Sequence, residues 1–163
     1  GGLMQRQGLT AVMVAGYDDS PTVLVPWRLI DKAEDAAAMA REIAAVRRPS
    51  MTSTHTGAAV TFALRQLDAA PCTADRQIID LVTDGEGDDP ARLARAREDA
   101  IAQDVRINVL AVNTPLGRGD PAAWARDHAA TPAGFVMQAD GWAEFARALQ
   151  RKIAFEVSGV NPR

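Results

Sequence analysis

Two short segments of this sequence carry side-chain oxygen atoms of the kind that hold metal ions. Residues Ser53–Gly57 are rich in hydroxyl groups and open a predicted helix, and the mostly apolar run Ile78–Thr83 ends at Asp84. A run of this kind followed by Asp-Gly is typical of a buried parallel strand that delivers a carboxylate to the carboxyl edge of a sheet. Hydroxyl and carboxylate oxygens at one such edge are ligands suited to Mg²⁺.

Each segment also has a purely structural interpretation. The hydroxyls of residues 52–56 can satisfy free N–H groups at the start of a helix, and Asp84 can serve as an ordinary turn residue. Beyond it, Glu86, Asp88 and Asp89 form an acidic cluster. Their spacing does not follow the EF-hand pattern, which needs a bidentate Glu at the twelfth position. We expect a solvated cluster at a helix start, where the helix dipole favours acidic groups.

Other chemistry-bearing residues indicate structural roles. Asp80 lies inside the predicted buried strand, so it should have a hydrogen-bonded or charged partner. His55 and His128 are the only histidines, and neither has metal-pair spacing or a Ser or Cys nucleophile in a strand-turn-helix elbow. Residues 117–119 lack the strand–glycine-rich–helix context of a dinucleotide site. The tryptophans are expected to pack: Trp27, Trp124 and Trp142.

Composition limits the function classes. The 163 residues fit one domain, with 47% hydrophobic and 24% charged residues. A net charge of −3 and an aromatic content of 5% give no support to nucleic-acid binding. The single Cys72 excludes an internal disulfide and a cysteine-based zinc cluster. No apolar run approaches the length of a membrane span.

The elements that position these residues alternate between strands and helices. Leu9–Gly16 and Thr22–Trp27 predict a hairpin, with Pro26 marking a sheet edge. The first predicted helix covers residues 31–46, with Asp31 as its cap and its inner side made of Ala37, Ala40, Ile43 and Ala44. The second follows Thr56, and its apolar residues at helical spacing are Val60, Ala63, Leu64 and Leu67. Further helices are predicted from Asp89-Pro90 onward, over Pro121–Ala130 and over Trp142–Phe155. The remaining strands are Gln77–Val82, Ile107–Val112 and Gly134–Ala139. This alternation predicts an α/β fold: a doubly wound, mostly parallel sheet with helices on both faces and one antiparallel edge strand.

These features together resemble a von Willebrand factor A-type domain, closest to a branch of uncharacterised bacterial proteins. The segments that match in order are Val25–Trp27, Arg47–Pro49, Thr54–Thr56, Thr83–Glu86 and Trp142–Ala146. The resemblance implies that Thr54 and Asp84 ligate a divalent ion, Mg²⁺ or else Mn²⁺ or Ca²⁺. It also implies a non-enzymatic module that binds a protein offering a carboxylate, and a periplasmic or secreted location.

One part of the family pattern is absent from the sequence. The Asp-x-Ser-x-Ser loop follows the family's first strand, and this sequence has Gly1-Gly2 where that loop should end. We therefore expect residues 1–158 to form the domain without its first strand, residues 159–163 to be a frayed tail, and metal binding to be weak or absent. The space beside Gln77–Val82 should be filled by a strand that belongs to the molecule but lies outside the given sequence, by a separate strand or by a second copy, unless its flanking strands pair directly. The alternative functions are a metal-dependent α/β hydrolase and a degenerate, metal-free interaction domain.

Overall fold

The computed structural model describes residues 9–46, 53–115 and 119–158, with the backbone alone for residues 142, 146 and 153–158. Strands and helices alternate along the chain as the sequence predicts. In order they are β1 (Thr10–Gly16), β2 (Thr22–Ile30), α1 (Ala33–Ala45), α2 (Thr56–Asp68), β3 (Gln77–Thr83), α3 (Pro90–Ala102), β4 (Val105–Asn113), α4 (Pro121–Trp124), the π-helical turn η1 (Ala125–Ala129), β5 (Val136–Asp140) and α5 (Trp142–Ser158).

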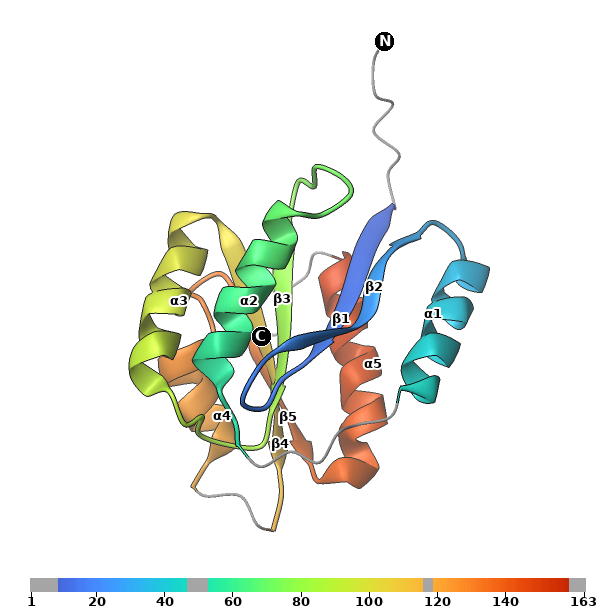
Figure 1. Ribbon diagram of the computed structural model, residues 1–163. Coiled ribbons are helices and arrows are strands. Elements are labelled where there is room, and N and C mark those ends of the chain that lie inside the picture. Colours follow the sequence, from blue (N-terminus) through green and yellow to red (C-terminus); the bar gives the residue numbers. More distant parts are fainter. Residues whose placement is uncertain (1–8, 47–52, 116–118, 159–163) are drawn as a thin grey trace.

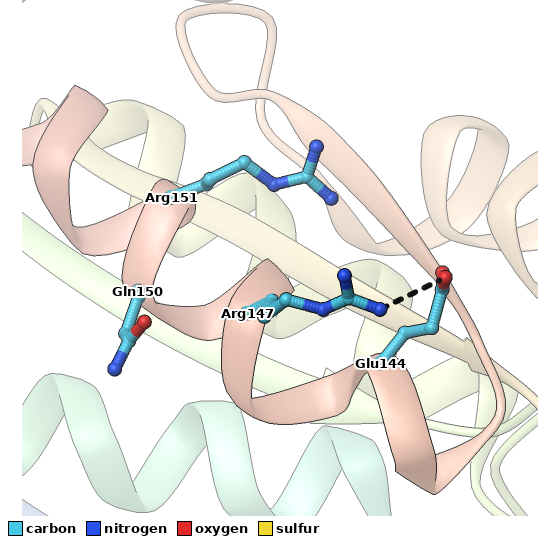
Figure 2. Close-up of a pocket in the computed structure, with 4 residues that line it drawn as sticks. All are labelled: Glu144, Arg147, Gln150 and Arg151. Carbon is cyan, nitrogen blue, oxygen red and sulfur yellow. Dashed lines mark hydrogen bonds and ion pairs between the residues drawn. The ribbon is translucent and has the colours of Figure 1, made fainter.

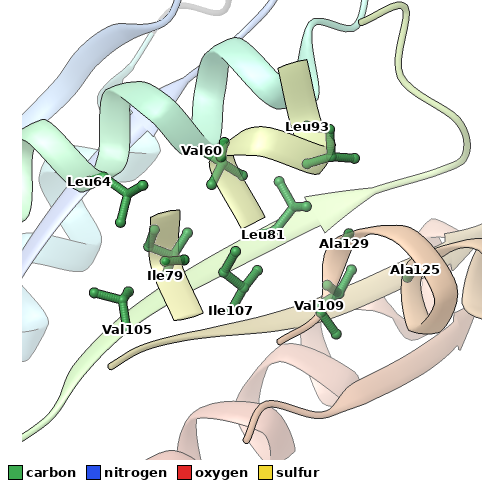
Figure 3. Close-up of a cluster of buried hydrophobic side chains, with 13 residues drawn as sticks. Val60, Leu64, Ile79, Leu81, Leu93, Val105, Ile107, Val109, Ala125 and Ala129 are labelled. Carbon is green, nitrogen blue, oxygen red and sulfur yellow. The ribbon is translucent and has the colours of Figure 1, made fainter. Parts of the chain in front are cut away.

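A parallel sheet of β3, β4 and β5 forms the centre of the molecule (Figure 1). Its middle strand, β4, is buried along almost its whole length because it has strands on both sides and helices on both faces. One face carries the larger apolar cluster, in which Val60 and Leu64 of α2 and Leu93 of α3 pack on β3 and β4 (Figure 3). On the other face, Ala148 of α5 packs against Leu110.

The hairpin forms a second, antiparallel sheet. β1 pairs with β2 from Thr10 opposite Ile30 to Gly16 opposite Thr22, and α1 packs on β2. Pro26 is exposed, as expected for an edge strand. The predicted α/β class, with parallel strands and an antiparallel edge, is therefore confirmed. Within the described residues the strands divide into two sheets, and β1 does not pair with β3.

Two predictions about α1 are wrong. The helix begins at Ala33, and Asp31 does not cap it; instead, the Asp35 carboxylate accepts the backbone N–H groups of Asp31 and Lys32, both at 3.2 Å. The predicted inner side, made of Ala37, Ala40, Ile43 and Ala44, is exposed. The face turned inward carries Met39, which is buried, and Glu42, whose ion pair with Arg28 of β2 at 3.0 Å fixes the rotation of the helix.

The other elements follow the prediction more closely. In α2, Val60 and Leu64 are buried, as the helical spacing indicates. Pro90 opens α3, and the helix predicted over Pro121–Ala130 is present as α4 continued by the π-helical turn η1. The segment Arg47–Pro49, in which the sequence resembles the family, and residues 159–163, for which the sequence predicts a frayed tail, lie outside the described residues.

Candidate functional site

The two hydroxyl- and carboxylate-bearing loops lie against each other at the carboxyl end of β3. Asp88 joins them, because its Oδ2 accepts the Thr54 N–H at 2.7 Å and its own N–H donates to the Thr54 carbonyl oxygen at 2.7 Å. These two hydrogen bonds connect residues far apart in sequence. The loop that follows Asp84 is thereby held directly on the backbone of Thr54.

Asp89 makes the second connection between the loops. Its carboxylate accepts the N–H of Gly57 and that of Ala58, each at 2.8 Å. Asp89 therefore caps the first turn of α2, whereas its side chain makes no capping bond to α3, which it precedes in sequence. Asp88 is exposed, as the prediction of a solvated cluster has it, and Asp89 is half-buried. The sequence did not predict that both side chains bind the amides of the neighbouring loop.

Close packing requires glycine at two positions around the loops, Gly57 against α3 and Gly87 against the start of α2. A Cβ added to Gly57 would overlap the backbone of Leu93 in α3, and one added to Gly87 would meet the hydroxyl of Thr56. Thr56 Oγ1 is buried and makes no hydrogen bond of ordinary geometry. Thr56 is 0% exposed, so this hydroxyl is enclosed at the junction of the two loops.

Tyr17, which sequence reasoning did not single out, belongs to the same edge. Its hydroxyl donates to the Val82 carbonyl oxygen at 2.7 Å. Burial raises the pKa of Tyr17 to about 12; the nearby threonine hydroxyls lower it, and the negative charges of Asp84 and Asp89 raise it further. The apolar run of β1 continues into Tyr17 in the sequence, and this was the only signal that could have placed the phenol near the site.

The two predicted ligands differ in exposure. Thr54 is half-buried and Asp84 is exposed, so both can be reached from solvent. The Thr54 backbone is fixed by Asp88, and Ser53 beside it donates its hydroxyl to Asp19. Asp84 follows β3 directly, as the sequence predicts. The structure thus brings together the loops that carry these two residues.

The side-chain oxygens of Thr54 and Asp84 are of the type that binds a divalent ion, but two protein ligands are too few to complete its coordination. Threonine hydroxyl and carboxylate oxygens are hard ligands of the type that Mg²⁺ prefers, but Mg²⁺ requires near-octahedral coordination. The Asp88 and Asp89 carboxylates are engaged by backbone N–H groups. In residues 9–46, 53–115 and 119–158, three or more His, Cys, Asp or Glu side chains nowhere cluster as metal ligands would. Thr54 and Asp84 would leave most coordination positions to water or a partner.

A second surface feature lies on α5. A hollow of about 530 Å³ is lined by Glu144, Arg147, Gln150 and Arg151, with an ion pair of 3.5 Å between Glu144 and Arg147 (Figure 2). The named lining residues all come from one helix, and Arg147 and Arg151 are exposed. The hollow is therefore separate from the loops that carry Thr54 and Asp84.

Asp80 has the charged partner that its position predicts. Lys152 of α5 forms an ion pair with it, and the Lys152 ammonium also lies 5.6 Å from the centre of the Phe135 ring. The Lys152 side chain is 1% exposed, whereas that of Asp80 is 39% exposed, so the pair opens to water only on the carboxylate side. This pair connects β3 to α5 and serves the fold.

The other singled-out residues have structural surroundings. His55 is half-buried with its Nδ1 3.9 Å from Asp19, and His128 is exposed with its ring centre 6.3 Å from that of Trp124. Trp124 packs on the larger apolar cluster, and Trp27 is half-buried. The Trp142 side chain and residues 117 and 118 lie outside the described parts.

Among the described helices, none has the length and apolar character that crossing a membrane requires.

Comparisons with known proteins agree with this architecture. A family described as "Protein of unknown function (DUF1194)" matches residues 2–161. The search of curated proteins gives no match. Among solved structures, proximal thread matrix protein 1 of the mussel byssus matches with a TM-score of 0.66 and 14% identity, over 90% of this chain and 36% of its own length.

Two further structures have the same fold. A von Willebrand factor type A protein from Catenulispora acidiphila has a TM-score of 0.66 and 22% identity, over 91% of this chain and 34% of that one. The manganese-loaded TRAP protein of Plasmodium vivax has a TM-score of 0.55 and 19% identity, over 88% of this chain and 56% of that one. The chain thus spans about a third of the first two solved chains and just over half of the third. At these identities the likeness shows the von Willebrand A fold.

Proposed function

Because the chain belongs to the DUF1194 family of proteins of unknown function and has a von Willebrand A-type fold, we propose that it is a protein-interaction module that binds its partner at the edge carrying Thr54 and Asp84. Domains of this fold are typically adhesion or protein-interaction modules. The resemblance also favours a periplasmic or secreted location, which fractionation of cells would test.

One observation carries the proposal: Asp88 and Asp89 hold the two loops together by hydrogen bonds of 2.7–2.8 Å. A binding surface made of loops loses affinity when the loops must be ordered on binding. Here the backbone on both sides is already fixed, while Asp84 remains exposed and Thr54 partly so. In this proposal, the loops that carry the two oxygen ligands need little further ordering when a partner binds.

In this proposal a divalent ion contributes affinity by being incompletely coordinated. Thr54 and Asp84 would supply two oxygens, water would supply others, and a carboxylate of the partner would complete the set. With so few protein ligands, the ion alone should bind weakly, with a dissociation constant on the order of 1 mM. The partner's carboxylate and the ion should each raise the affinity for the other, as linkage requires.

Titration with Mn²⁺, followed by paramagnetic broadening of backbone amide signals, tests this site. We expect broadening centred on the two loops, and its loss in Asp84→Asn and Thr54→Val. Asp140→Asn is the matched control, because Asp140 is also an exposed carboxylate at the end of a parallel strand. A short peptide with one Glu should tighten Mn²⁺ binding, and its Gln version should not.

The same titration tests the metal-free alternative. Engagement of Asp88 and Asp89 by backbone amides favours this alternative, because one Asp88 oxygen and both Asp89 oxygens already accept hydrogen bonds from backbone N–H groups. If Mn²⁺ broadens no loop signals, or if Asp84→Asn behaves like the unchanged protein, the ion-dependent mechanism is wrong. A surface that binds protein without metal would then be the remaining function for this edge.

A further inference from the structure

The hairpin turn, residues 17–20 between β1 and β2, contacts the first loop of the candidate site. Figure 1 shows this turn beside the start of α2. The Asp18 carbonyl oxygen accepts the His55 N–H at 3.3 Å, and the Asp19 carboxylate accepts the Ser53 hydroxyl. These two bonds hold the residues directly before and after the predicted threonine ligand.

The same turn also holds the strand end that carries the second predicted ligand. The Tyr17 hydroxyl donates to the Val82 carbonyl oxygen at 2.7 Å, two residues before Asp84. The buried Thr83 continues this connection, because its hydroxyl donates to the Gly85 carbonyl oxygen at 2.8 Å and accepts the Gly85 N–H at 3.3 Å. The backbone is therefore fixed on both sides of Asp84.

The hairpin turn is itself well ordered by its own contacts. The Asp18 carboxylate accepts the Ser20 N–H at 3.1 Å, which closes the turn. The Tyr17 ring packs on the larger apolar cluster. Burial raises the pKa of the phenol to about 12, against the lowering effect of the Thr83 and Thr56 hydroxyls beside it. A hydrogen bond enclosed in this way is not readily replaced by one to water.

We propose that the hairpin turn is a third loop of the candidate site, in which Tyr17 positions Asp84 and Asp19 positions Thr54. Both act through a neighbouring residue, Tyr17 through Val82 and Asp19 through Ser53. Ligands on separate loops must be held within roughly 0.5 Å of the productive geometry to bind one ion. Loss of either contact should therefore weaken binding although both ligands remain. This inference rests on the proposed function, since it concerns the same two ligands.

Two variants each remove one of these hydrogen bonds. Tyr17→Phe keeps the ring and loses the donor to Val82, and Asp19→Ala removes the acceptor of the Ser53 hydroxyl. In Mn²⁺ titrations of the 163-residue chain, each should raise the dissociation constant roughly two- to tenfold, the effect of one hydrogen bond. Asp19→Asn should bind Mn²⁺ like the unchanged protein, because its amide oxygen can still accept the hydroxyl.

Thr131→Val is the matched control for a purely structural loss. Thr131 is buried, and its hydroxyl accepts the Ile107 N–H at 3.0 Å near the start of β4, whereas the candidate site lies at the carboxyl end of the neighbouring strand. This variant should lower stability to urea at least as much as Tyr17→Phe and leave the Mn²⁺ dissociation constant unchanged. Ion affinity therefore separates positioning from a general effect on the fold.

Amide ¹⁵N relaxation of the free protein measures the positioning without any ion. The order parameter of the Thr54 amide should fall in Asp19→Ala, and that of the Asp84 amide in Tyr17→Phe, from about 0.85 toward roughly 0.6. If the unchanged protein binds no Mn²⁺, the ion-dependent mechanism under the proposed function fails, and these order parameters alone decide the role of the turn.

Three results would overturn the proposal. The first is that both variants leave the order parameters, or the Mn²⁺ affinity of a protein that binds Mn²⁺, unchanged. The second is that Asp19→Asn weakens Mn²⁺ binding as much as Asp19→Ala, since the charge and not the hydrogen bond would then matter. The third is that Thr131→Val weakens Mn²⁺ binding as much as Tyr17→Phe.

Discussion

At the residue scale, Asp89 stabilises a helix other than the one that its place in the sequence suggests. Its carboxylate binds two amides at the start of α2, although it lies beside α3 in sequence. Charge-assisted hydrogen bonds of this kind at a helix start are stronger than those of neutral caps. The start of α2 therefore depends on a loop more than thirty residues further along the chain.

Asp89→Ala should lower the free energy of unfolding by about 1–2 kcal/mol, because two N–H groups at the start of α2 lose their acceptor. Urea denaturation followed by circular dichroism measures this loss. Asp140→Ala, an exposed carboxylate, should change stability by less than about 0.5 kcal/mol. Equal effects of the two substitutions would mean that the Asp89 cap contributes no specific stability.

Tyr17 gives a prediction about pH. With its pKa raised from the ordinary value of 10.0 to about 12, the folded chain retains the phenol proton after the unfolded chain has lost it. The stabilisation from the neutral phenol should therefore be complete below pH 10 and lost as pH rises through about 12. Tyr17 is the only tyrosine, so ultraviolet absorbance of tyrosinate reports it alone. A midpoint near 10 in the folded protein would contradict the burial of this phenol.

The sequence alone could predict part of the candidate site. The position of Asp84 followed from a local pattern, an apolar strand ending before Gly85, and such patterns survive folding. The roles of Asp88 and Asp89 could not be predicted from the sequence, because their partners lie more than thirty residues away and only the folded chain brings them together. A local rule assigns a carboxylate to the helix that follows it, and here a tertiary contact changes that assignment.

At the scale of elements, the Asp80–Lys152 pair connects β3 to α5. Lys152 is almost fully buried, so removal of its partner leaves a buried charge poorly compensated. Because Asp80 is partly exposed, we expect Asp80→Asn to cost about 1–3 kcal/mol, less than the loss of a fully buried pair.

The double variant Asp80→Asn/Lys152→Met is the matching test, since methionine fills a similar volume without a charge. It should recover much of the stability lost in Asp80→Asn, measured by urea denaturation of both proteins. If the double variant is as unstable as the sum of the single changes, the pair is not coupled, and the buried charge is not the cause of the loss.

Comparison of α1 and α2 shows when the helical spacing of apolar residues is enough to predict which face of a helix is buried. In α2 the predicted inner face is turned inward, with Val60 and Leu64 buried and Ala63 and Leu67 partly buried, because this helix packs on the parallel sheet and on α3. In α1 several faces are rich in alanine, so the pattern did not distinguish them. The rotation of α1 is set by Met39 and by the ion pair from Glu42 to Arg28, contacts that depend on β2.

At the scale of the whole molecule, burial is unevenly distributed between the two sheets. The strands β3 and β4, together with α2, α3 and η1, form nearly all of the larger apolar cluster. Val25 and Met39 are the buried apolar residues described in the hairpin and α1. The alternation of strands and helices predicted the fold class, but no sequence pattern predicts which strands pair with each other in a sheet and which do not. That division depends on contacts between residues far apart in the sequence.

Hydrogen exchange of the free protein should follow this division. Amides of β4 should exchange slowest, near the rate set by global unfolding, and those of β1, β2 and α1 should exchange at least about tenfold faster through partial opening. Mass spectrometry of peptic fragments resolves the two groups. Uniform exchange across both sheets would show that the chain unfolds as one cooperative unit.

The way α2 is held has a consequence for protein engineering. The helix is fixed at its start by Asp89 and along its side by α3, so its covalent connection to β3 at residues 69–76 is not what keeps it in place. That connection is mostly exposed and lies at the opposite end of the helix from the Asp84 loop. Thirteen residues of helix separate the two ends, roughly 20 Å. Circular permutation or fusion of a fluorescent label at 69–76 would therefore provide an attachment point that leaves the loop edge uncovered.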